Sequence, residues 1–478
     1  MQTSIAELLT TPEGKTFECK RDLSSPQNLL KTLVAFATSA GGLALIGVAD
    51  GTREVIGLPE PMQAEEQLCN LIADGIAPRL VPNVQLVAYG DLNLLLVEVF
   101  PSGQRPHHLI KQGPEQGVFV RLGSTNRQAD AVLIEELRRS VSGAAFDEQP
   151  IADLSVDDLD REAITGAFAG IRSMNDQDLH SLRVLTTVQG RDVPTAGGVL
   201  LFGRDRERWF PDAWLQCARF VGTSKAGIFD QLDIHAPLPQ ALEQALAFLK
   251  KHAVRSADFQ ELRRVDRWSI PLASLREALT NALVHADYSQ RGAPIRVAFF
   301  DDRIEIENPG VLIPGLTTED LPRGISRLRN RVISRVFREL GLIEQWGSGV
   351  PVILEEAASQ QLPPPAFEEV GLRFRVTLPL ATPSPAGQGQ SRIRGAESRA
   401  ESGAESLAVG SLAASVLQAL AQGPLSKSEI AQALGRDSVS GALNRTIRQL
   451  LDRDEIGYTL PETPNSRLQK YRLLQQPQ

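Results

Sequence analysis

Cysteine is scarce in this chain of 478 residues, which has only Cys19, Cys69 and Cys217. None of them forms a CxxC pair or lies near paired histidines, so the spacing excludes a typical zinc site and a disulfide framework. This usage is typical of a reducing compartment, and we expect a cytoplasmic protein. The first residues lack a basic stretch followed by an apolar one, so no signal peptide is expected.

The chain also lacks a hydrophobic run long enough to span a membrane. The longest run, LVAFATSAGGLALIGVA at 33–49, is shorter than the roughly 20 residues of a spanning helix, and Gly41-Gly42 interrupts it. The run predicts a buried helix, a turn and a buried strand, and no membrane partner is expected.

Positive charge is in deficit, since 50 Lys and Arg face 58 Asp and Glu and the formal net charge is −8. A field of this sign argues against a protein that coats nucleic acid nonspecifically, although it leaves room for local basic patches. The composition, 42% hydrophobic and 23% charged, is that of a folded globular chain. The length predicts roughly three domains.

Alternating helix and strand signals predict an α+β multidomain protein. Residues 1–145 form a first unit, and residues 150–380 form a second that ends in the strand LRFRVTLPL. Residues 381–405 are rich in Gly, Ser, Ala and charge, which predicts a flexible linker. Residues 406–478 regain helical periodicity and end in a strand hairpin, the outline of a winged helix.

One apolar helix carries a polar residue at every fourth position. In REALTNALVHADYS, residues 276–289, these are Glu277, Asn281 and His285, which drift only about 40° per step and can face one cleft. A carboxylate can deprotonate a water, and an amide oxygen one turn further can hold Mg²⁺. The combination suits hydrolysis at a nucleotide γ-phosphate, and the alternative is a solvated polar face.

Two later stretches favour the nucleotide hypothesis. IENPG at 306–310 leaves a strand into a Pro-Gly turn, and WGSG at 346–349 offers backbone N–H groups that can cradle phosphate at a helix start. In this order, REALTNALVHADYS, DRIEIENPG and RNRVISRVFRELGLIEQWGSGV resemble the GHKL (Bergerat-type) ATP-binding domain, an α/β sandwich. They resemble more closely its divergent bacterial branch, labelled RecG-related or AAA-4, over about residues 150–380.

The resemblance implies ATP and Mg²⁺ as cofactors, with Glu277 as the water-activating base and Asn281 as the Mg²⁺ ligand. Asn308 replaces the usual adenine-reading aspartate and the long Gly-rich lid is missing, so ATP binding is expected rather than fast hydrolysis. The chain has no GxxxxGK[ST] loop, and helicase activity is not predicted. The implied nucleotide contacts are Asn281, His285, Asn308, Gly310, Arg329, Asn330, Gly347, Ser348 and Gly349.

The N-terminal region combines acidic and basic residues near strand ends. PEGKTFECKRD contains Glu13, Glu18 and Lys20, and ALIGVADG delivers Asp50 at a strand end. Such acids can bind a metal and hydrolyse phosphodiesters, and the lysine can contact phosphate, although a solvated charged face is the simpler interpretation. The ordered set E....ECK, AFATSAGGLALIGVADG and VFVRLGSTNRQAD resembles the Schlafen-type AlbA-like domain over about residues 10–140.

This second resemblance implies nucleic-acid binding. The candidate phosphate contacts are Lys20, Arg121 and Arg127. Some Schlafen proteins cleave RNA with three acidic residues, whereas many bacterial relatives are binders, so cleavage is the alternative. The residues that correspond to the acidic triad are Glu13, Glu18 and Asp50.

The C-terminal region places basic and polar residues where a winged helix contacts DNA. The stretch SVSGALNRTIRQLL predicts a recognition helix, and the hairpin after it predicts a wing. The candidate DNA contacts are Ser440, Asn444, Arg445, Arg448, Arg467 and Lys470. The alternative is a winged helix used for protein contacts.

These features predict an ATP-binding, DNA-binding homo-oligomer, most simply a dimer, in which ATP alters the binding of DNA, or of RNA. Transcription control and a stress or phage-defence response are the expected settings. The rival hypothesis is a metal-dependent nuclease gated by ATP.

Overall fold

The computed structural model describes most of the chain. The described residues are 4–253, 270–325, 327–343, 349–380, 416–417, 419–420, 423–433, 446–447, 450–451, 456–459 and 470–474, with the backbone of 255–258 and 265–268. The chain forms two compact units, Met1–Ser384 and Pro385–Gln478. Within the described residues, no helix is both long enough and apolar enough to cross a membrane.

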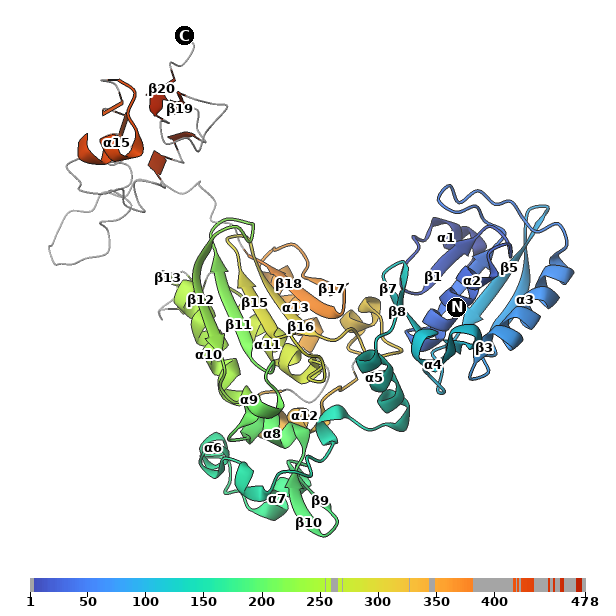
Figure 1. The fold of residues 1–478 in the computed structure, drawn as a ribbon, viewed down its shortest axis with the longest axis horizontal. Helices are drawn as coiled ribbons and strands as arrows, with labels where there is room; N and C mark the ends of the chain where they lie inside the picture. The colour runs from blue at the N-terminus through green and yellow to red at the C-terminus, as the bar shows by residue number, and fades with distance from the viewer. Residues whose placement is uncertain are drawn as a thin grey trace. The chain divides into compact units, whose positions relative to one another are not determined.

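The first unit begins with a domain built on a four-stranded sheet (Figure 1). The strand order is β1 (Phe17–Lys20), β2 (Gly42–Ile46), β5 (Leu92–Val99) and β4 (Asn83–Tyr89). β1 and β2 are parallel, and the other neighbours are antiparallel. Because alternate strand residues point to opposite sides, α2 (Pro26–Thr38) and α3 (Pro61–Gly75) bury one face while α1 (Ile5–Thr10) covers the other.

The predicted helix–turn–strand in the long apolar run is confirmed. Gly41 has φ +82°, and a Cβ there would lie 2.7 Å from the Val99 carbonyl oxygen, so the turn between α2 and β2 requires glycine. The domain is completed by β3 (Ile76–Ala77), β6 (His108–Leu109), η1 (Ile110–Gln112), α4 (Gly113–Gln116), β7 (Phe119–Leu122), β8 (Thr125–Gln128), α5 (Ala131–Ser142) and η2 (Phe146–Glu148).

Arg121, on β7, lies inside this domain rather than on its surface. Its side chain is 1% exposed and forms an ion pair with Glu18 on β1. The guanidinium also donates to the Gly14 carbonyl and to Asn126 Oδ1, at 3.0 and 2.9 Å. The structure therefore gives Arg121 a role in joining strands, in place of the predicted phosphate contact.

A connecting region leads to the second domain of this unit. It contains η3 (Val156–Asp158), α6 (Arg161–Ala167), α7 (Asp176–Ser181), β9 (Leu185–Val188), β10 (Arg191–Pro194), α8 (Ala196–Phe202) and α9 (Arg206–Trp209). β9 and β10 form an antiparallel pair.

The second domain is a six-stranded sheet covered by helices, the α/β sandwich that the pattern predicted (Figure 1). The strand order is β12 (Ile228–Ile234), β11 (Leu215–Phe220), β15 (Ile295–Phe299), β16 (Arg303–Pro309), β18 (Arg373–Pro379) and β17 (Ala366–Val370). Only the β11–β15 pair is parallel. The remaining elements are α10 (Leu238–His252), β13 (Arg255–Asp258), β14 (Val265–Trp268), α11 (Leu272–His285), η4 (Thr318–Arg323), α12 (Arg331–Glu339) and α13 (Gly349–Ser359).

Helix α12 is held at its N-terminus by Asp147, a buried residue of η2. The carboxylate accepts hydrogen bonds from the backbone N–H groups of Arg331, Val332 and Ile333, at 2.9, 2.6 and 3.0 Å. Three of the unpaired N–H groups that every helix start exposes are thereby satisfied. Burial nevertheless raises the pKa of Asp147 to about 7.

The second unit has a small core of its own. It contains α15 (Lys427–Ala433) and an antiparallel pair formed by β19 (Ile456–Tyr458) and β20 (Tyr471–Leu473). Buried residues include Val416, Leu420 and Ile430. The terminal hairpin matches the predicted one, while the predicted linker and most of the predicted recognition helix and wing lie outside the described residues: 381–405, Ser440, Asn444, Arg445, Arg448 and Arg467.

Arg121→Ala should destabilise the N-terminal domain, because it leaves the buried carboxylate of Glu18 without its main partner. We expect a loss of about 3 kcal/mol, the lower end of the cost of breaking a buried ion pair. Arg127→Ala, at an exposed position on β8, is the control and should change stability by less than about 0.5 kcal/mol. Urea denaturation measures both, and equal small effects would contradict the internal role of Arg121.

Candidate nucleotide-binding site

A cavity of about 360 Å³ lies between α11, α12, α13 and the sheet, and its lining includes the segment formed by residues 311–325 and 327–328. We call this segment the roof. Seven of the predicted nucleotide residues line the cavity: Glu277, Asn281, His285, Asn308, Gly310, Arg329 and Gly349. Residues that lie far apart in the sequence are therefore gathered around one space.

Helix α11 divides its residues between core and cavity as its spacing predicts. Leu275, Leu279 and Leu283 are fully buried in the core, whereas the polar series faces the cavity. Asn281 Nδ2 donates to Glu277 Oε1 at 3.0 Å, so the amide fixes the carboxylate one turn away. The Asn281 carbonyl oxygen is not used in this bond and is the oxygen of this side chain that could face a cation.

The carboxylate of Glu277 meets the start of α13. A Cβ at Gly349, the first residue of that helix, would lie 1.9 Å from Glu277 Oε1, so any larger residue there would force this carboxylate to move. The first N–H groups of a helix lack partners within the helix and attract anions. This end of the cavity therefore combines a carboxylate, an amide and a helix N-terminus; Gly347 and Ser348 lie outside the described residues.

The opposite wall comes from the end of β16. Asn308 is 4% exposed, and its Nδ2 donates to the Pro309 carbonyl at 3.0 Å. Gly310 has φ +96°, and a Cβ there would lie 2.4 Å from an Arg329 nitrogen. Apolar side chains of β17 and β18 continue this wall: Phe367, Phe374 and Val376. Such a lining suits a planar base, whereas the α13 end suits its phosphates.

His285 enters the cavity as a neutral side chain. Burial, together with the positive charge of Arg329, lowers the pKa of the His285 imidazole to about 4. At neutral pH the ring therefore carries one N–H donor and one acceptor nitrogen.

Arg329 and Asn330 hydrogen-bond the C-terminal end of α11. Asn330 is fully buried, and its Nδ2 donates to the carbonyls of Val284 and Ala286, at 2.9 and 2.7 Å. Arg329 lines the cavity, but its guanidinium is bonded to the His285 and Val311 carbonyls and to the Glu136 carboxylate. Asn330 does not line the cavity in this structure, and its contact with a nucleotide stays a prediction.

The roof also contacts the N-terminal domain. The Gly315 N–H donates to the Ser39 carbonyl at 3.0 Å, and the Leu312 N–H donates to Glu369 Oε1 at 2.8 Å. The same oxygen lies 2.5 Å from Lys15 Nζ, so one carboxylate holds the roof and the N-terminal domain together. Ser39 Oγ in turn accepts from the Arg121 N–H at 2.9 Å.

The predicted nucleic-acid residues of the N-terminal domain have different surroundings. Lys20 forms an ion pair with the buried Glu18, and Arg127 is exposed. Glu13 accepts a hydrogen bond from the Cys19 N–H at 3.0 Å. Asp50 is exposed after β2, and within the described residues no group of three or more Asp, Glu, His or Cys could hold a metal ion. The proposed acidic triad is therefore not assembled in this structure.

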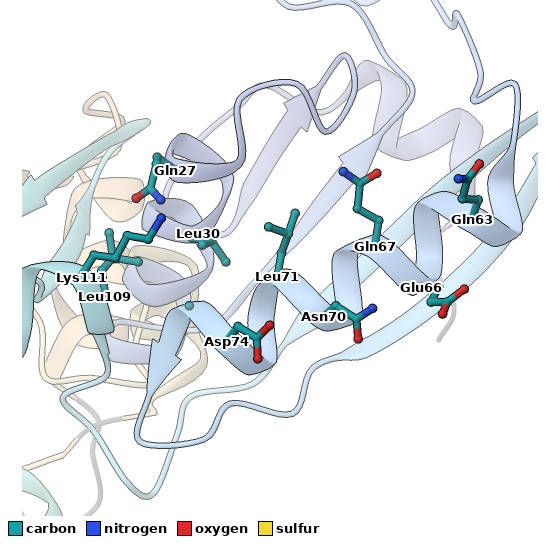
Figure 2. Close-up of a pocket in the computed structure, with 11 residues that line it drawn as sticks. Gln27, Leu30, Gln63, Glu66, Gln67, Asn70, Leu71, Asp74, Leu109 and Lys111 are labelled. Atoms are coloured by element: carbon teal, nitrogen blue, oxygen red, sulfur yellow. The ribbon is translucent and has the colours of Figure 1, made fainter.

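A second cavity, of about 440 Å³, lies in the N-terminal domain between α2, α3 and η1 (Figure 2). Figure 2 shows Gln63, Gln67, Asn70 and Asp74 along α3, with Lys111 across the groove. Glu66 adds a second carboxylate. Two carboxylates against one lysine do not suit a phosphate, so this groove is a poor match for the phosphate contacts that the sequence predicted.

The sequence analysis did not identify three polar residues that line the cavity: Arg327, Ser334 and Arg338. Ser334 and Arg338 are four residues apart on α12, the same spacing that marked the polar series of α11.

Comparison with known families confirms both resemblances. Residues 13–130 match the family model described as "Schlafen, AlbA_2", and residues 292–378 match "Putative ATP-dependent DNA helicase recG C-terminal". Residues 413–474 match "Filamentation induced by cAMP protein Fic-like, C-terminal domain". The first two matches indicate an ATP-binding protein that is associated with nucleic acid. No curated protein matches the chain.

Two solved structures are similar to this chain. The crystal structure of the DIP2311 protein from Corynebacterium diphtheriae is 18% identical, with a TM-score of 0.43, over 94% of this chain and 91% of that one. The solution structure of the N-terminal domain of a RecG-related "Putative ATP-dependent DNA Helicase" protein from Nitrosomonas europaea is 26% identical, with a TM-score of 0.22, over 27% of this chain and 94% of that one.

Gly349→Ala should displace the carboxylate of Glu277, because the added methyl group would overlap Oε1. We expect affinity for Mg²⁺-ATP to fall by about 10-fold or more, the effect of losing one charge-assisted contact. Gly166→Ala, at an open position in α6, is the control and should bind like the parent. Isothermal titration calorimetry measures both, and unchanged affinity in Gly349→Ala would remove this end of the cavity from the binding site.

Proposed function

We propose that the chain binds ATP and Mg²⁺ in the cavity beneath the roof, and that the bound nucleotide changes its affinity for DNA. The observation that carries this proposal is the meeting of Glu277, Asn281 and the start of α13 in a cavity that apolar side chains of the sheet also line. The matched RecG-related family model supports the same assignment.

The charges of the cavity fit a nucleotide triphosphate. Its basic lining residues are Arg327, Arg329 and Arg338, and Glu277 is its one acidic residue within the described part of the chain. Mg²⁺ prefers oxygen ligands and keeps several waters, so a single amide oxygen, from Asn281, together with the phosphates fits its demands. Glu277 would orient and deprotonate the attacking water if ATP is hydrolysed.

The roof supports a link between the nucleotide and the N-terminal domain. Since it covers the cavity and also bonds Ser39 and, through Glu369, Lys15, a nucleotide that moves the roof changes contacts to the other domain. We propose that the N-terminal domain and the C-terminal region, as a winged helix, bind the DNA. The wing residue Lys470 is described and forms an ion pair with Glu429 at 3.0 Å.

We propose that the chain acts in transcription control or in a stress or phage-defence response. A dimeric cytoplasmic regulator of transcription, or a factor in stress or phage defence, would use ATP binding as a signal in this way. Cleavage of nucleic acid receives less support, because the three acidic residues proposed for it do not form a metal-holding group.

Two substitutions on α11 test the ATP site, because one should affect hydrolysis and the other should affect binding. Glu277→Gln keeps the size of the side chain but removes the base, so we expect ATP to bind and any hydrolysis to fall by about 100-fold or more. Asn281→Ala removes the metal ligand, so Mg²⁺-dependent ATP binding should itself weaken. Calorimetry and phosphate release measure the two effects. If the parent binds no ATP, the proposal is wrong.

The link is tested by Lys15→Met, which removes the ammonium group beside Glu369 without touching the cavity. In the parent we expect ATP to change DNA affinity by about 5-fold or more, the usual lower range of coupling between sites. The variant should bind ATP normally and lose most of that change.

Lys225→Met is the matched control, because Lys225 is exposed beside Glu305, away from the roof. Anisotropy of labelled duplex DNA with and without ATP gives the coupling in each protein. A full ATP effect in Lys15→Met would show that the roof contacts do not transmit it.

A further inference from the structure

The C-terminal end of α12 lies beside the carboxylate end of the cavity. The Gly341 N–H donates to the Arg338 carbonyl at 3.0 Å, and Arg276, next to Glu277 on α11, donates to the Gly341 carbonyl at 3.2 Å. Arg338 lines the cavity from this position. Glu277 and Asn281 line the same cavity, so the arginine shares this space with the residues proposed to meet the phosphates and Mg²⁺.

Arg338 differs from the other arginines around it in having no partner within the described residues. Arg327 donates to the Pro314 carbonyl, and Arg329 is occupied by Glu136 and two carbonyls. On α12 itself, Arg331 and Arg335 both pair with Glu148. No ion pair or hydrogen bond engages the exposed side chain of Arg338 in the described part of the chain.

Ser334, one turn before Arg338, provides a second and independent observation. It is 1% exposed and lines the same cavity, yet its hydroxyl has no hydrogen-bond partner among the residues that the structure describes. A buried polar atom without a partner is unfavourable, and a ligand that offers a donor or acceptor removes this cost. The helix therefore presents an unsatisfied hydroxyl and a guanidinium on one face, toward one cavity.

We propose that α12 forms a second wall of the nucleotide site, in which Arg338 binds the γ-phosphate of ATP and Ser334 hydrogen-bonds the nucleotide closer to the core. This inference rests on the proposed ATP site. Since ADP lacks the γ-phosphate, Arg338 makes the site selective for ATP over ADP, while Ser334 contacts both nucleotides. A protein that signals the presence of ATP needs this distinction.

The test compares ATP and ADP affinities of the full chain with Mg²⁺, by calorimetry. In Arg338→Ala we expect the Kd for ATP to rise by about 10- to 100-fold, the range for a hydrogen bond to a charged group, and the Kd for ADP to change by less than about 3-fold. Arg338→Lys, which keeps the charge but loses the two-pronged donor geometry, should fall between parent and Arg338→Ala.

Arg138→Ala is the matched control, because that arginine lies on α5, outside the cavity and the roof, and its side chain is 49% exposed. Ser334→Ala should raise both Kd values by about 3- to 10-fold. It should also leave the melting temperature of the free protein unchanged or higher, because it removes an unsatisfied buried group. A purely structural serine would instead lower the melting temperature.

The possible results distinguish a failure of the Arg338 assignment from a failure of the ATP site. If the parent binds neither nucleotide, the ATP site itself is refuted. If the parent binds ATP and folded Arg338→Ala keeps the parent's preference for ATP over ADP, the ATP site stands and the assignment of Arg338 is wrong. Should Arg338→Ala fail to fold, the ratio measured for Arg338→Lys decides in its place.

Discussion

The nucleotide cavity depends on how the C-terminal end of α11 is held. The last carbonyls of a helix have no partner within it, and here Asn330 takes those of Val284 and Ala286 while Arg329 takes that of His285. The same guanidinium bonds the roof and Glu136 of α5. One arginine thus fixes the helix that carries the polar series, the cover of the cavity and the neighbouring domain, and removing one partner of so buried a pair is costly.

The polar face of α11 could be predicted because helical periodicity is local. Glu277, Asn281 and His285 are related by spacing alone, and the leucines between them define the core side. Arg329 and Asn330 could not be placed in this way. Their partners lie between 18 and 193 residues away in sequence. A motif indicates that two polar residues matter without showing whether they face a ligand or a helix end. The ion pair of Arg121 with Glu18, 103 residues away, could not be predicted for the same reason.

The wall formed by α12 was missed because burial there does not follow residue type. Val332, Ile333, Val336 and Phe337 are buried as their polarity predicts, but Ser334 is buried among them. Its environment comes from the packing of α12 against elements far away in sequence, and a single serine in an amphipathic helix gives little sign of it. Periodicity in the sequence identifies the residues on one face of a helix, whereas tertiary packing determines which elements that face contacts.

The roof imposes a constraint that acts in both directions. Its contacts to the N-terminal domain involve side chains that are mostly buried, Lys15 with Glu369 and Arg329 with Glu136, so they are less screened than surface ion pairs. Suppose that ATP and DNA both favour the same position of the roof against the N-terminal domain. Each ligand must then change the affinity for the other by the same factor. The coupling is then limited by the free energy of these few contacts, because a ligand shifts an equilibrium only by its differential affinity for the two states.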